Sequence, residues 1–568
     1  MKSSKYTIKD VVEHRSKKIK FLVSRFIRDV PDTHDYLARL DEELDIVEKK
    51  NFVKCFLQVS DIITYTRSRG IPHVLRGSGA SSLLCFLLGI TNIDPVKENM
   101  ALARFMNNNR EDQPDIDIDV PHWVRPEILQ HLYEKWPGRV ARISNDVKYR
   151  KKTALRKVLK DHGVKGRIPK YFKVEDYFSR PGKIQQIKEE AESLVGQHRH
   201  WSLHCGGLIV YDDEIPEDLI LKDNQISLTK YDVDEQNLIK IDLLCNRGLS
   251  QLWEIDSRPL CEYPEEDPRI AELLCSGDVL GLTQAESRTM RKCFMALQPK
   301  NWHDVALALA LIRPAAADGG RKAAYFRDLE EGKKKKMMIY DDDSIYFIAT
   351  SLGISMDEAD AYRRGFKKRN EATIGKFYRL LNRRRWKELQ VRQLNDLNKY
   401  SFCKGHALAY GQLVWALAYH KCYNPQRFWK ATLKHCNSSY RKWVHKREAQ
   451  CNGVFVKNKN YELDIKEQFL KDGWWSGDSF LPGCGYEYGN DGYYVFRGIV
   501  ANTRTIRRYG KSLKFVTIGY ANQKYLDLVI DGEVWDGNYK IIQGCGKLCK
   551  KNGAEYIEVE KMWKTWVT

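Results

Sequence analysis

The sequence predicts a multidomain α+β protein, and three observations lead to this fold class. The chain has 568 residues. This is more than a single hydrophobic core usually supports, so roughly three or four domains are expected. Apolar residues recur with helical spacing in several stretches, beginning with residues 52–63. Between residues 495 and 530, by contrast, apolar and polar residues alternate in short runs separated by turn residues, which is typical of strands.

The chain is strongly basic. It has 95 Lys and Arg residues against 75 Asp and Glu residues, which gives a formal net charge of +20. Such an excess favours a polyanionic partner, and nucleic acid is the leading candidate. Binding to acidic membranes or proteins is the alternative, but the sequence lacks a long basic amphipathic helix with a clean apolar face. It also lacks a secretory signal and any apolar run of membrane-spanning length, so we expect a cytoplasmic protein without membrane contact.

The fourteen cysteines follow no regular framework, as expected for reduced thiols in the cytosol. Cys545 and Cys549 form a C-x-x-x-C pair near the end of the chain. Because no second pair with suitable spacing follows, the sequence leaves open whether these two residues bind zinc.

Residues 1–50 are charged and show short helical periods, which predicts a small basic helical lead-in with a solvated face. Residues 69–90 then predict a strand, a turn rich in glycine and serine, and a helix. This arrangement presents backbone N–H groups to a phosphate, although Gly-Ser-Gly alone is more often a plain structural turn. Arg76, directly before the turn, and Arg104 further along favour the phosphate-binding interpretation.

One acidic stretch, residues 114–120, stands out in this basic chain. Side chains alternate along a strand, so three aspartates would project from one face and three apolar residues would bury the other: Asp115, Asp117 and Asp119 against Ile116, Ile118 and Val120. Carboxylates this close repel one another unless a cation neutralises them, and oxygen ligands suit Mg²⁺ or Mn²⁺. An amphipathic edge strand with a solvated acidic face is the alternative.

Four segments together resemble the palm of the C family of DNA polymerases, which is typified by the alpha subunit of bacterial DNA polymerase III. They are residues 76–80, 88–95, 104–105 and 114–119, and their order and spacing match the family pattern. The phenylalanines of the family's acidic motif are replaced here by Ile116 and Val120, which keep the apolar face. The resemblance runs from about residue 52 to residue 530. It implies a nucleotidyltransferase-type palm, similar to that of polymerase beta, that works with two Mg²⁺ ions.

The resemblance also assigns roles further along the chain. Residues 238–244 form an apolar strand interrupted by Lys240 and Asp242 on one face, and a buried carboxylate needs a partner or a metal. By resemblance, Asp242 is the third catalytic aspartate and Lys240 is a phosphate contact. His204 lies in a segment similar to the family's His-Ala-Gly-Gly, although a lone histidine is more often structural.

Residues 258–440 correspond to the fingers of the family. Arg313 ends a helix that resembles the one whose arginine approaches the incoming triphosphate. Lys404 and His406 lie in a segment similar to the family's Phe-Asn-Lys-Ser-His-Ser-Ala-Ala-Tyr. Cations at these positions would neutralise triphosphate charge. The chain departs from the family pattern at residues 315–316 and at residues 340–343, where Tyr-Gln-Glu-Gln is replaced by Tyr-Asp-Asp-Asp.

Two further regions are candidates for contact with DNA. Residues 137–197 are predicted to be basic and helical and take the position of the family's thumb, with Lys148, Lys151, Lys152 and Arg156 as candidate contacts. The segment is short for a thumb, so a looser hold on DNA is expected, and a solvated basic helix is the alternative. The strands of residues 495–530 fit an OB-type barrel, which the family carries after its fingers. Arg504, Arg507 and Lys511 on its loops would hold single-stranded template, and a purely structural barrel is the alternative.

These segments define the predicted domains: a helical basic lead-in at 1–50, a palm at 51–257 with a short thumb inserted at about 137–197, helical fingers at 258–440, a connecting region at 441–490 and an OB-fold-like domain at 491–568. The family's amino-terminal polymerase and histidinol phosphatase domain has no room here. We therefore expect a minimal form of the enzyme, encoded by a bacterium or by a phage or mobile element.

The sequence thus predicts a template-directed DNA polymerase that adds deoxynucleoside triphosphates to a primer 3′ end. By resemblance, Asp115, Asp117 and Asp242 hold two Mg²⁺ ions, with Mn²⁺ as the alternative. Nucleotide contacts are expected from Arg76, Gly77, Ser78, Arg104, Lys240, Arg313, Lys404 and His406. A template-independent nucleotidyltransferase and a non-catalytic nucleic-acid-binding scaffold are the alternatives. A sliding clamp and other replication factors are left open as partners.

Overall fold

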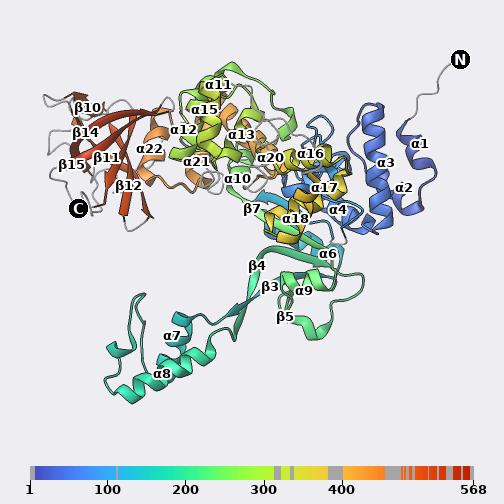
Figure 1. Ribbon diagram of the computed structural model, residues 1–568, viewed down its shortest axis with the longest axis horizontal. Coiled ribbons are helices and arrows are strands. Elements are labelled where there is room, and N and C mark those ends of the chain that lie inside the picture. The colour runs from blue at the N-terminus through green and yellow to red at the C-terminus, as the bar shows by residue number, and fades with distance from the viewer. Residues whose placement is uncertain are drawn as a thin grey trace. The chain divides into compact units, whose positions relative to one another are not determined.

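The computed structural model describes residues 7–110, 113–312, 321–332, 338–381, 401–454, 475–476, 479–480, 485–488, 493–508, 511–520, 524–532, 541–551 and 554–562. The chain divides into two compact units (Figure 1). The larger unit comprises residues 1–111, 116–125 and 245–568, and the smaller unit comprises residues 112–115 and 126–244. Both units contain helices and strands, which confirms the predicted mixed α+β class.

Four helices open the larger unit: α1 (Ile8–Glu13), α2 (Lys17–Val23), α3 (His34–Lys49) and α4 (Val53–Ser68). Helix α3 buries a stripe of apolar residues at helical spacing, formed by Leu37, Leu40, Leu44 and Val47. Helix α4 confirms the helix predicted from the apolar period at residues 52–63.

The predicted strand, turn and helix follow. They are β1 (Val74–Arg76), the 3-10 helix η1 (Gly77–Ser81) and α5 (Leu83–Leu87), and after the short helix η2 (Leu102–Arg104) comes the acidic strand β2 (Ile116–Pro121). Strands β1 and β2 pair antiparallel, with Arg76 opposite Asp117. Ile116, Ile118 and Val120 are fully buried, as the alternation predicts.

A buried carboxylate joins helix α3 to the glycine-rich turn. Glu43 of α3 is fully buried. It accepts hydrogen bonds from Ser82 Oγ at 2.7 Å and from the backbone N–H groups of Leu83 and Leu84 at 2.7 and 3.0 Å. Arg39 Nε donates to the same carboxylate at 2.8 Å. Glu43 therefore satisfies the free N–H groups at the start of α5 and fixes the end of the turn that precedes it.

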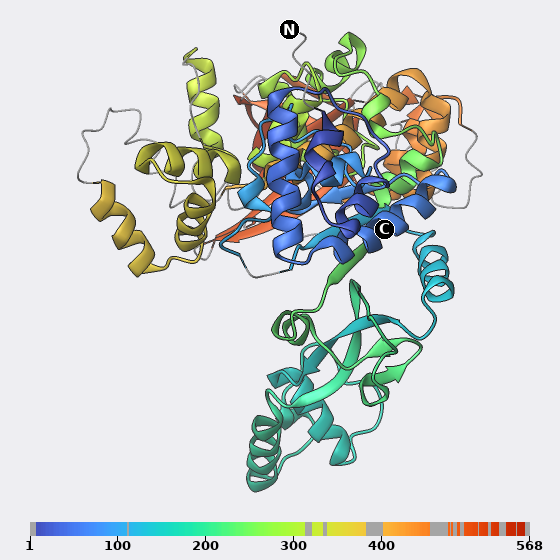
Figure 2. The ribbon, with the colours of Figure 1, turned by 90° about the vertical axis from the view of Figure 1, so that its right-hand side faces the viewer.

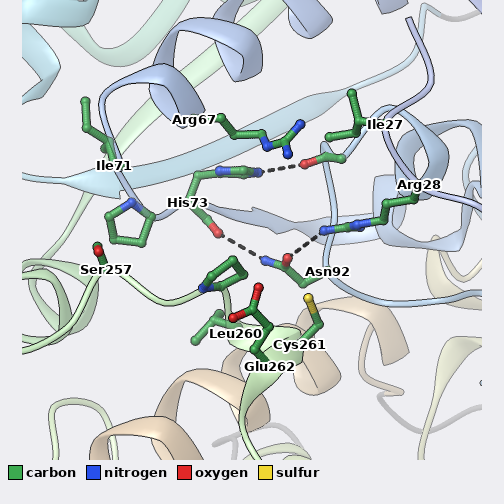
Figure 3. Close-up of a pocket in the computed structure, with 14 residues that line it drawn as sticks. Ile27, Arg28, Arg67, Ile71, His73, Asn92, Ser257, Leu260, Cys261 and Glu262 are labelled. Carbon is green, nitrogen blue, oxygen red and sulfur yellow. Dashed lines mark hydrogen bonds between the residues drawn. The ribbon is translucent and has the colours of Figure 1, made fainter.

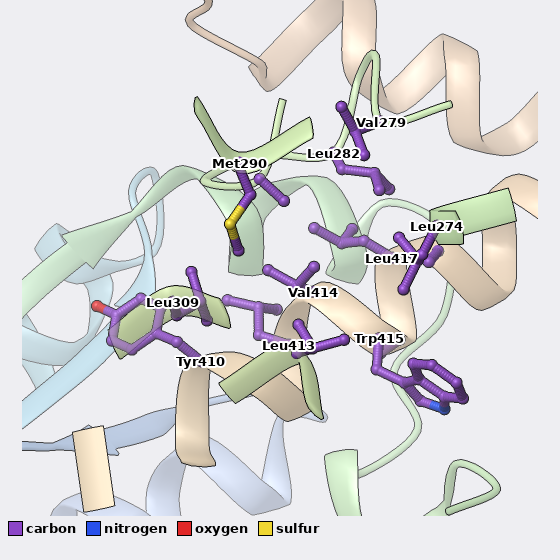
Figure 4. Close-up of a cluster of buried hydrophobic side chains, with 14 of the residues drawn as sticks. Leu274, Val279, Leu282, Met290, Leu309, Tyr410, Leu413, Val414, Trp415 and Leu417 are labelled. Carbon is purple, nitrogen blue, oxygen red and sulfur yellow. The ribbon is translucent and has the colours of Figure 1, made fainter. Parts of the chain in front are cut away.

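Helices dominate the larger unit after residue 246: α10 (Arg247–Trp253), η5 (Leu260–Glu262), α11 (Pro268–Cys275), α12 (Arg288–Leu297), α13 (Trp302–Leu311), α15 (Arg321–Glu330), α16 (Asp341–Leu352), α17 (Met356–Lys367), α18 (Glu371–Leu381), α20 (Lys404–Tyr423), α21 (Pro425–His435) and α22 (Lys442–Cys451). Helix α20 lies at the centre of the main core, where its apolar side chains meet those of α11, α12 and α13 (Figure 4). Gly411 permits the close approach of α13, because a Cβ there would lie 2.8 Å from the carbonyl oxygen of Trp302.

Helices α16, α17 and α18 form a smaller group with a core of their own, seen in olive in Figure 2. Phe366 and Phe377 meet edge to face at its centre, with ring centroids 5.0 Å apart. None of the helices in the described part of the chain combines the length and the apolar character needed to cross a bilayer.

The smaller unit is built on one sheet. Its elements are α6 (Arg125–Lys135), β3 (Val140–Lys148), α7 (Lys151–Asp161), η3 (Val174–Asp176), α8 (Pro181–Leu194), β4 (His198–Val210), η4 (Glu217–Leu219), β5 (Ile220–Lys222), β6 (Gln225–Ile226), α9 (Lys230–Glu235) and β7 (Lys240–Asn246). The strands lie in the order β7-β4-β3-β6-β5. Helices α7 and α8 lie at the far end of the long β3–β4 ladder (Figure 1) and share an apolar cluster.

One prediction for this unit was wrong. Residues 137–197 were expected to be helical throughout, but residues 140–148 form strand β3. Val140, Ala141 and Ile143 are buried there, and β3 pairs antiparallel with β4 over its whole length. Lys148 therefore ends a strand, whereas Lys151, Lys152 and Arg156 lie on helix α7.

The C-terminal part of the larger unit consists of strands, which confirms the strands predicted within residues 495–530. They are β8 (Trp475–Ser476), β9 (Ser479–Phe480), β10 (Gly485–Tyr488), β11 (Tyr494–Arg508), β12 (Lys511–Tyr520), β13 (Lys524–Asp531), β14 (Ile541–Lys551) and β15 (Ala554–Met562). Six of them form a sheet in the order β10-β11-β12-β13-β15-β14, and β14 pairs with β11 as well. An apolar cluster of their inward-facing residues fills the interior.

The Glu43 contact predicts a specific loss of stability. Replacing Glu43 by Gln removes the charge that pairs with Arg39 and turns one of the two accepting oxygens into an NH₂ donor that faces another donor, so the free energy of unfolding should fall by about 3 kcal/mol. Urea denaturation followed by tryptophan fluorescence measures this. Asp35→Asn, at the exposed start of the same helix, is the control and should change stability by less than about 0.5 kcal/mol. Equal effects of the two substitutions would show that the Glu43 contacts contribute little.

Candidate active site

The glycine-rich turn begins with a backbone conformation that favours glycine. Gly77 has a φ of +80°, in the left-handed region. A Cβ at Gly77 would lie 3.8 Å from Asp117 Oδ2, so the turn lies directly beside this carboxylate. Helix α20 packs against the other side, since a Cβ at Gly405 would lie 2.9 Å from the Gly77 carbonyl oxygen. The structure thus places Arg76 and Gly77, and with them the start of the turn, beside Asp117.

Asp119, the last aspartate of the motif, is part of a buried network. Its side chain is almost fully buried. Asn246 Nδ2 donates to Oδ2 at 3.0 Å, the Tyr410 hydroxyl donates to the same oxygen, and Arg76 Nη2 lies 3.3 Å from Oδ1. Burial and the Asp119 carboxylate together raise the pKa of Tyr410. Sequence reasoning assigned no role to Tyr410 or Asn246, although Tyr410 lies in the segment that resembles the family's fingers.

Lys240 joins two of the predicted metal ligands within the smaller unit. Its ammonium donates to Asp115 Oδ1 at 3.1 Å and to Asp242 Oδ2 at 2.6 Å. Burial by itself would lower the pKa of Lys240, but the attraction of both carboxylates leaves that pKa raised. The prediction that Lys240 and Asp242 share one face of a strand is confirmed, because both lie on β7 and their side chains meet.

Asp115 and Asp242 have the properties of cation ligands. A carboxylate oxygen of Asp115 and one of Asp242 lie within 4.8 Å of each other. Asp115 is exposed, whereas Asp242 is buried and its Oδ1 has no hydrogen-bond partner among the described residues. A buried carboxylate oxygen without a donor is costly unless a cation neutralises it. Oxygen-only ligands fit Mg²⁺.

Asp117 follows Asp115 with one residue between them. Along an extended chain the two Cα atoms are therefore about 7 Å apart, with both side chains on the same face. Asp115 belongs to the smaller unit and Asp117 to the larger one. The covalent chain keeps the two carboxylates near each other.

His204 has a structural contact, which is the commoner role considered for it. Its Nδ1 accepts hydrogen bonds from the backbone N–H groups of Gly206 and Gly207, at 3.3 and 2.8 Å. The same atom lies 3.7 Å from Asp242 Oδ1. His204 therefore holds the backbone of β4 at Gly206 and Gly207, where Gly207 pairs with Asp242 of β7.

Arg104, a predicted nucleotide contact of the palm, has internal partners from the segment predicted as fingers. Arg104 Nε donates to Asp341 Oδ2 at 2.8 Å, and Arg363 Nη1 lies 3.5 Å from the same oxygen. Burial would raise the pKa of Asp341, but these arginines hold it below its usual value. The Tyr-Asp-Asp-Asp departure thus supplies a structural anion that pairs with Arg104, which sequence reasoning did not foresee because the two lie far apart in the chain.

Two further candidates lie at the start of helix α20. Lys404 Nζ donates to the carbonyl oxygens of Glu98 and Asn99. His406 stacks on Tyr410, with ring centroids 4.6 Å apart. Arg313 lies outside the described residues.

The candidate DNA contacts of the smaller unit differ in exposure. Lys148, Lys151 and Lys152 are exposed. Arg156, by contrast, is half-buried, donates to the carbonyl oxygen of Pro169 at 2.9 Å and lies over the Phe172 ring. The three lysines have partners that are at least partly exposed, Asp146, Glu192 and the Tyr171 ring, whereas Arg156 holds its own loop.

The C-terminal candidates are not on loops. Arg504 and Arg507 are exposed, but both lie within strand β11. Lys511 lies in strand β12, and its side chain is outside the described residues. The expectation of loop positions was wrong because β11 and β12 continue further toward each other than the alternation of apolar residues indicated.

Cys545 and Cys549 lie on one strand, β14. Four residues along a strand span about 13 Å. Two thiolates that bind one zinc ion each lie about 2.3 Å from it, so these two cysteines cannot share an ion without rearrangement of the strand. Cys549 instead donates to the carbonyl oxygen of Lys547.

A cavity of about 340 Å³ lies beside the start of β1, and no sequence argument pointed to it (Figure 3). Arg28 Nη2 donates to Asn92 Oδ1 at 2.8 Å, and His73 Nε2 lies 2.9 Å from the carbonyl oxygen of Gly89. Burial lowers the pKa of His73 to about 4, so this imidazole is neutral at pH 7. These contacts support the residues that lead into β1.

Two family models match the chain. The model described as the bacterial DNA polymerase III alpha NTPase domain matches residues 8–245. The model described as the bacterial DNA polymerase III alpha subunit finger domain matches residues 250–384. The two models match adjacent segments in the order in which the sequence motifs occur.

Three similar proteins are each named error-prone DNA polymerase. The one from Bordetella parapertussis is 28% identical over 456 residues, covering 70% of this chain and 43% of the relative. The one from Brucella suis is 27% identical over 464 residues, with 69% and 43% covered. The one from Bdellovibrio bacteriovorus is 28% identical over 495 residues, with 76% and 46% covered. The chain thus spans less than half the length of these relatives.

These relatives are bacterial proteins, and they give no support to an origin in a phage or mobile element. The two matching models agree with the geometry of the site. That geometry consists of the glycine-rich turn beside Asp117 and the contacts of Lys240 with Asp115 and Asp242. The chain belongs to the C family of DNA polymerases, typified by the alpha subunit of bacterial DNA polymerase III.

Proposed function

We propose that this protein is a template-directed DNA polymerase, which adds deoxynucleoside triphosphates to the 3′ end of a primer. The observation that carries the proposal is that the carboxylates of Asp115 and Asp242 both contact the Lys240 ammonium. They do so in a chain that belongs to a polymerase family. The relatives named error-prone DNA polymerase extend the proposal to an enzyme that inserts mismatched nucleotides as well.

Asp115, Asp117 and Asp242 would hold two Mg²⁺ ions, with Mn²⁺ as a substitute. When bound, such ions activate the primer 3′-hydroxyl and stabilise the charge on the triphosphate and the departing pyrophosphate. The orphaned Oδ1 of buried Asp242 and the oxygen-only donor set support this assignment.

Lys240 has a double role in this proposal. In the structure its ammonium neutralises Asp115 and Asp242. When cations take over that neutralisation, the ammonium is released from the carboxylates and can contact a phosphate. The Gly77–Ser78 backbone, with Arg76 beside it, presents N–H groups and positive charge to the triphosphate. Arg104, paired with Asp341, would position the fingers, and Arg313, Lys404 and His406 would complete the nucleotide site.

We further propose the domain roles that the family implies: a polymerase beta-like palm at 51–257, with the thumb segment at 137–197 contacting the duplex, and fingers at 258–440. The C-terminal strands would form an OB-type barrel. This is supported by the pairing of β11 with both β12 and β14, and of β15 with both β13 and β14. Arg504, Arg507 and Lys511 would then line a path for single-stranded template.

The metal assignment predicts a separation of catalysis from binding. Asp117→Asn should lower the rate of primer extension by at least about 10²-fold, because a ligand for the catalytic cations is lost. Its affinity for primer-template should stay within about twofold, since no phosphate contact changes. Extension of a labelled primer and fluorescence anisotropy measure the two quantities. Asp234→Asn, an exposed acid on α9, is the matched control and should keep the full rate. Ordinary activity of Asp117→Asn would refute the assignment.

The same extension assay separates the alternatives. With each deoxynucleotide supplied alone, preferential addition of the complementary one is expected. Equal addition of all four, regardless of template, would identify a template-independent nucleotidyltransferase. Tight DNA binding without any addition would identify a non-catalytic scaffold.

The thumb assignment predicts a change in salt dependence. Replacing Lys148, Lys151 and Lys152 together by Ala should reduce the slope of log affinity for duplex DNA against log salt concentration by roughly two to three, because about one counterion is released per phosphate contact. Anisotropy titrations between low and moderate salt measure the slope. The matched control replaces Lys17, Lys18 and Lys20 of α2, which are exposed and carry the same charge. A similar slope change in both triple variants would mean that net charge, not the thumb, is responsible.

A further inference from the structure

A second group of metal-ligating side chains lies in the larger unit, outside the residues proposed for catalysis. Glu286 precedes helix α12, Cys436 caps the end of α21, and His445 lies in α22. One ligand atom of each residue lies within 4.8 Å of the other two. Three separate segments therefore converge on one point with a carboxylate, a thiol and an imidazole.

The distances are close to those of a zinc site. Zn²⁺ binds sulfur at about 2.3 Å and nitrogen or oxygen at about 2.1 Å, so two ligands of a tetrahedral ion lie about 3.4–3.8 Å apart. Cys436 Sγ lies 3.6 Å from Glu286 Oε1. His445 Nε2 lies 2.8 Å from Glu286 Oε2, which needs to lengthen by less than about 1 Å.

The charges of this group also fit a divalent cation. Glu286 and His445 are each 6% exposed. A thiolate, a carboxylate and a neutral imidazole together carry the charge that neutralises Zn²⁺, so the loaded site would bury no net charge. Burial and the adjacent Glu286 carboxylate raise the pKa of Cys436 to about 12 in the absence of a metal. A coordinated cation reverses this effect, because it stabilises the thiolate.

The ligands are held in place by a buried polar network. The backbone N–H of Gly281 donates to Glu286 Oε2 at 3.0 Å. Gln251, which is fully buried, donates to the Gly281 carbonyl oxygen at 2.9 Å and accepts from Thr283 at 2.6 Å. Such contacts orient ligands before an ion binds.

We propose that Glu286, Cys436 and His445 bind one Zn²⁺ ion, with water as the expected fourth ligand. The ion would join α21, α22 and the segment before α12. These elements also contact the C-terminal sheet: Arg288 Nε lies 2.8 Å from Asp527 Oδ2, and the Tyr525 hydroxyl donates to Glu448 of α22 at 2.8 Å. The zinc would therefore brace the junction between the helices and this sheet.

The test is the metal content of the full chain. After exposure to zinc and removal of the excess, the protein should retain about one equivalent by mass spectrometry. Cobalt substitution should give the charge-transfer absorption of a thiolate bound to Co²⁺. Cys436→Ser and His445→Gln should lose both signals, although each new side chain can still donate a hydrogen bond to Glu286. Two control variants should keep both the zinc and the cobalt signal. They are Cys451→Ser, which changes an exposed cysteine on α22, the helix of His445, and Asp117→Asn.

Three outcomes would overturn the proposal. The first is a wild-type chain that retains no zinc, and the second is a cobalt complex without thiolate absorption. The third is equal zinc retention by Cys436→Ser, His445→Gln and Cys451→Ser. Because the first two are measured on the wild-type chain, a failure of either variant to fold does not rescue the proposal. Circular dichroism of each variant checks its folding.

Discussion

The arrangement of the larger unit depends on the contacts that the buried carboxylate of Asp119 makes. A charge this deeply buried is tolerated only with close partners. Here they come from β1, from the start of α10 and from α20, as Arg76, Asn246 and Tyr410. Asn246 also accepts from the first N–H groups of α10. The requirement to satisfy one carboxylate therefore holds the acidic strand, the glycine-rich turn and the central helix in one arrangement.

The same principle recurs in other parts of the chain. Glu43 is satisfied by the start of α5, Asp341 by Arg104 and Arg363, and Glu286 by His445 and Gly281. Acidic groups are thus used to join elements in the interior, whereas the lysines at 148, 151 and 152 stay exposed. Asp242 is different, because it shares the ammonium of Lys240 with a second carboxylate, that of the exposed Asp115. This grouping of two carboxylates makes Asp242 a candidate cation ligand rather than a residue that only joins elements.

The errors of sequence reasoning have physical causes. Residues 137–197 were taken as one basic helical segment, yet residues 140–148 pair with β4, which follows only after helices α7 and α8. Arg104 was assigned to a phosphate from its position shortly before the acidic motif and from the family resemblance. Its partner Asp341 reaches it only when the fingers fold. In both cases a distant segment decided the local outcome.

The sequence by itself determined the alternation that buries Ile116, Ile118 and Val120, the strand, turn and helix after residue 69, and the shared face of Lys240 and Asp242. These features depend on local periodicity and on the need of the turn for glycine at position 77, so the order of the residues is enough to predict them. Only the tertiary structure decided that Asp119 is an internal anion and that Glu286, Cys436 and His445 converge. The physical reason is that pairing energies depend on distance in space, which spacing along the chain does not encode for segments so far apart.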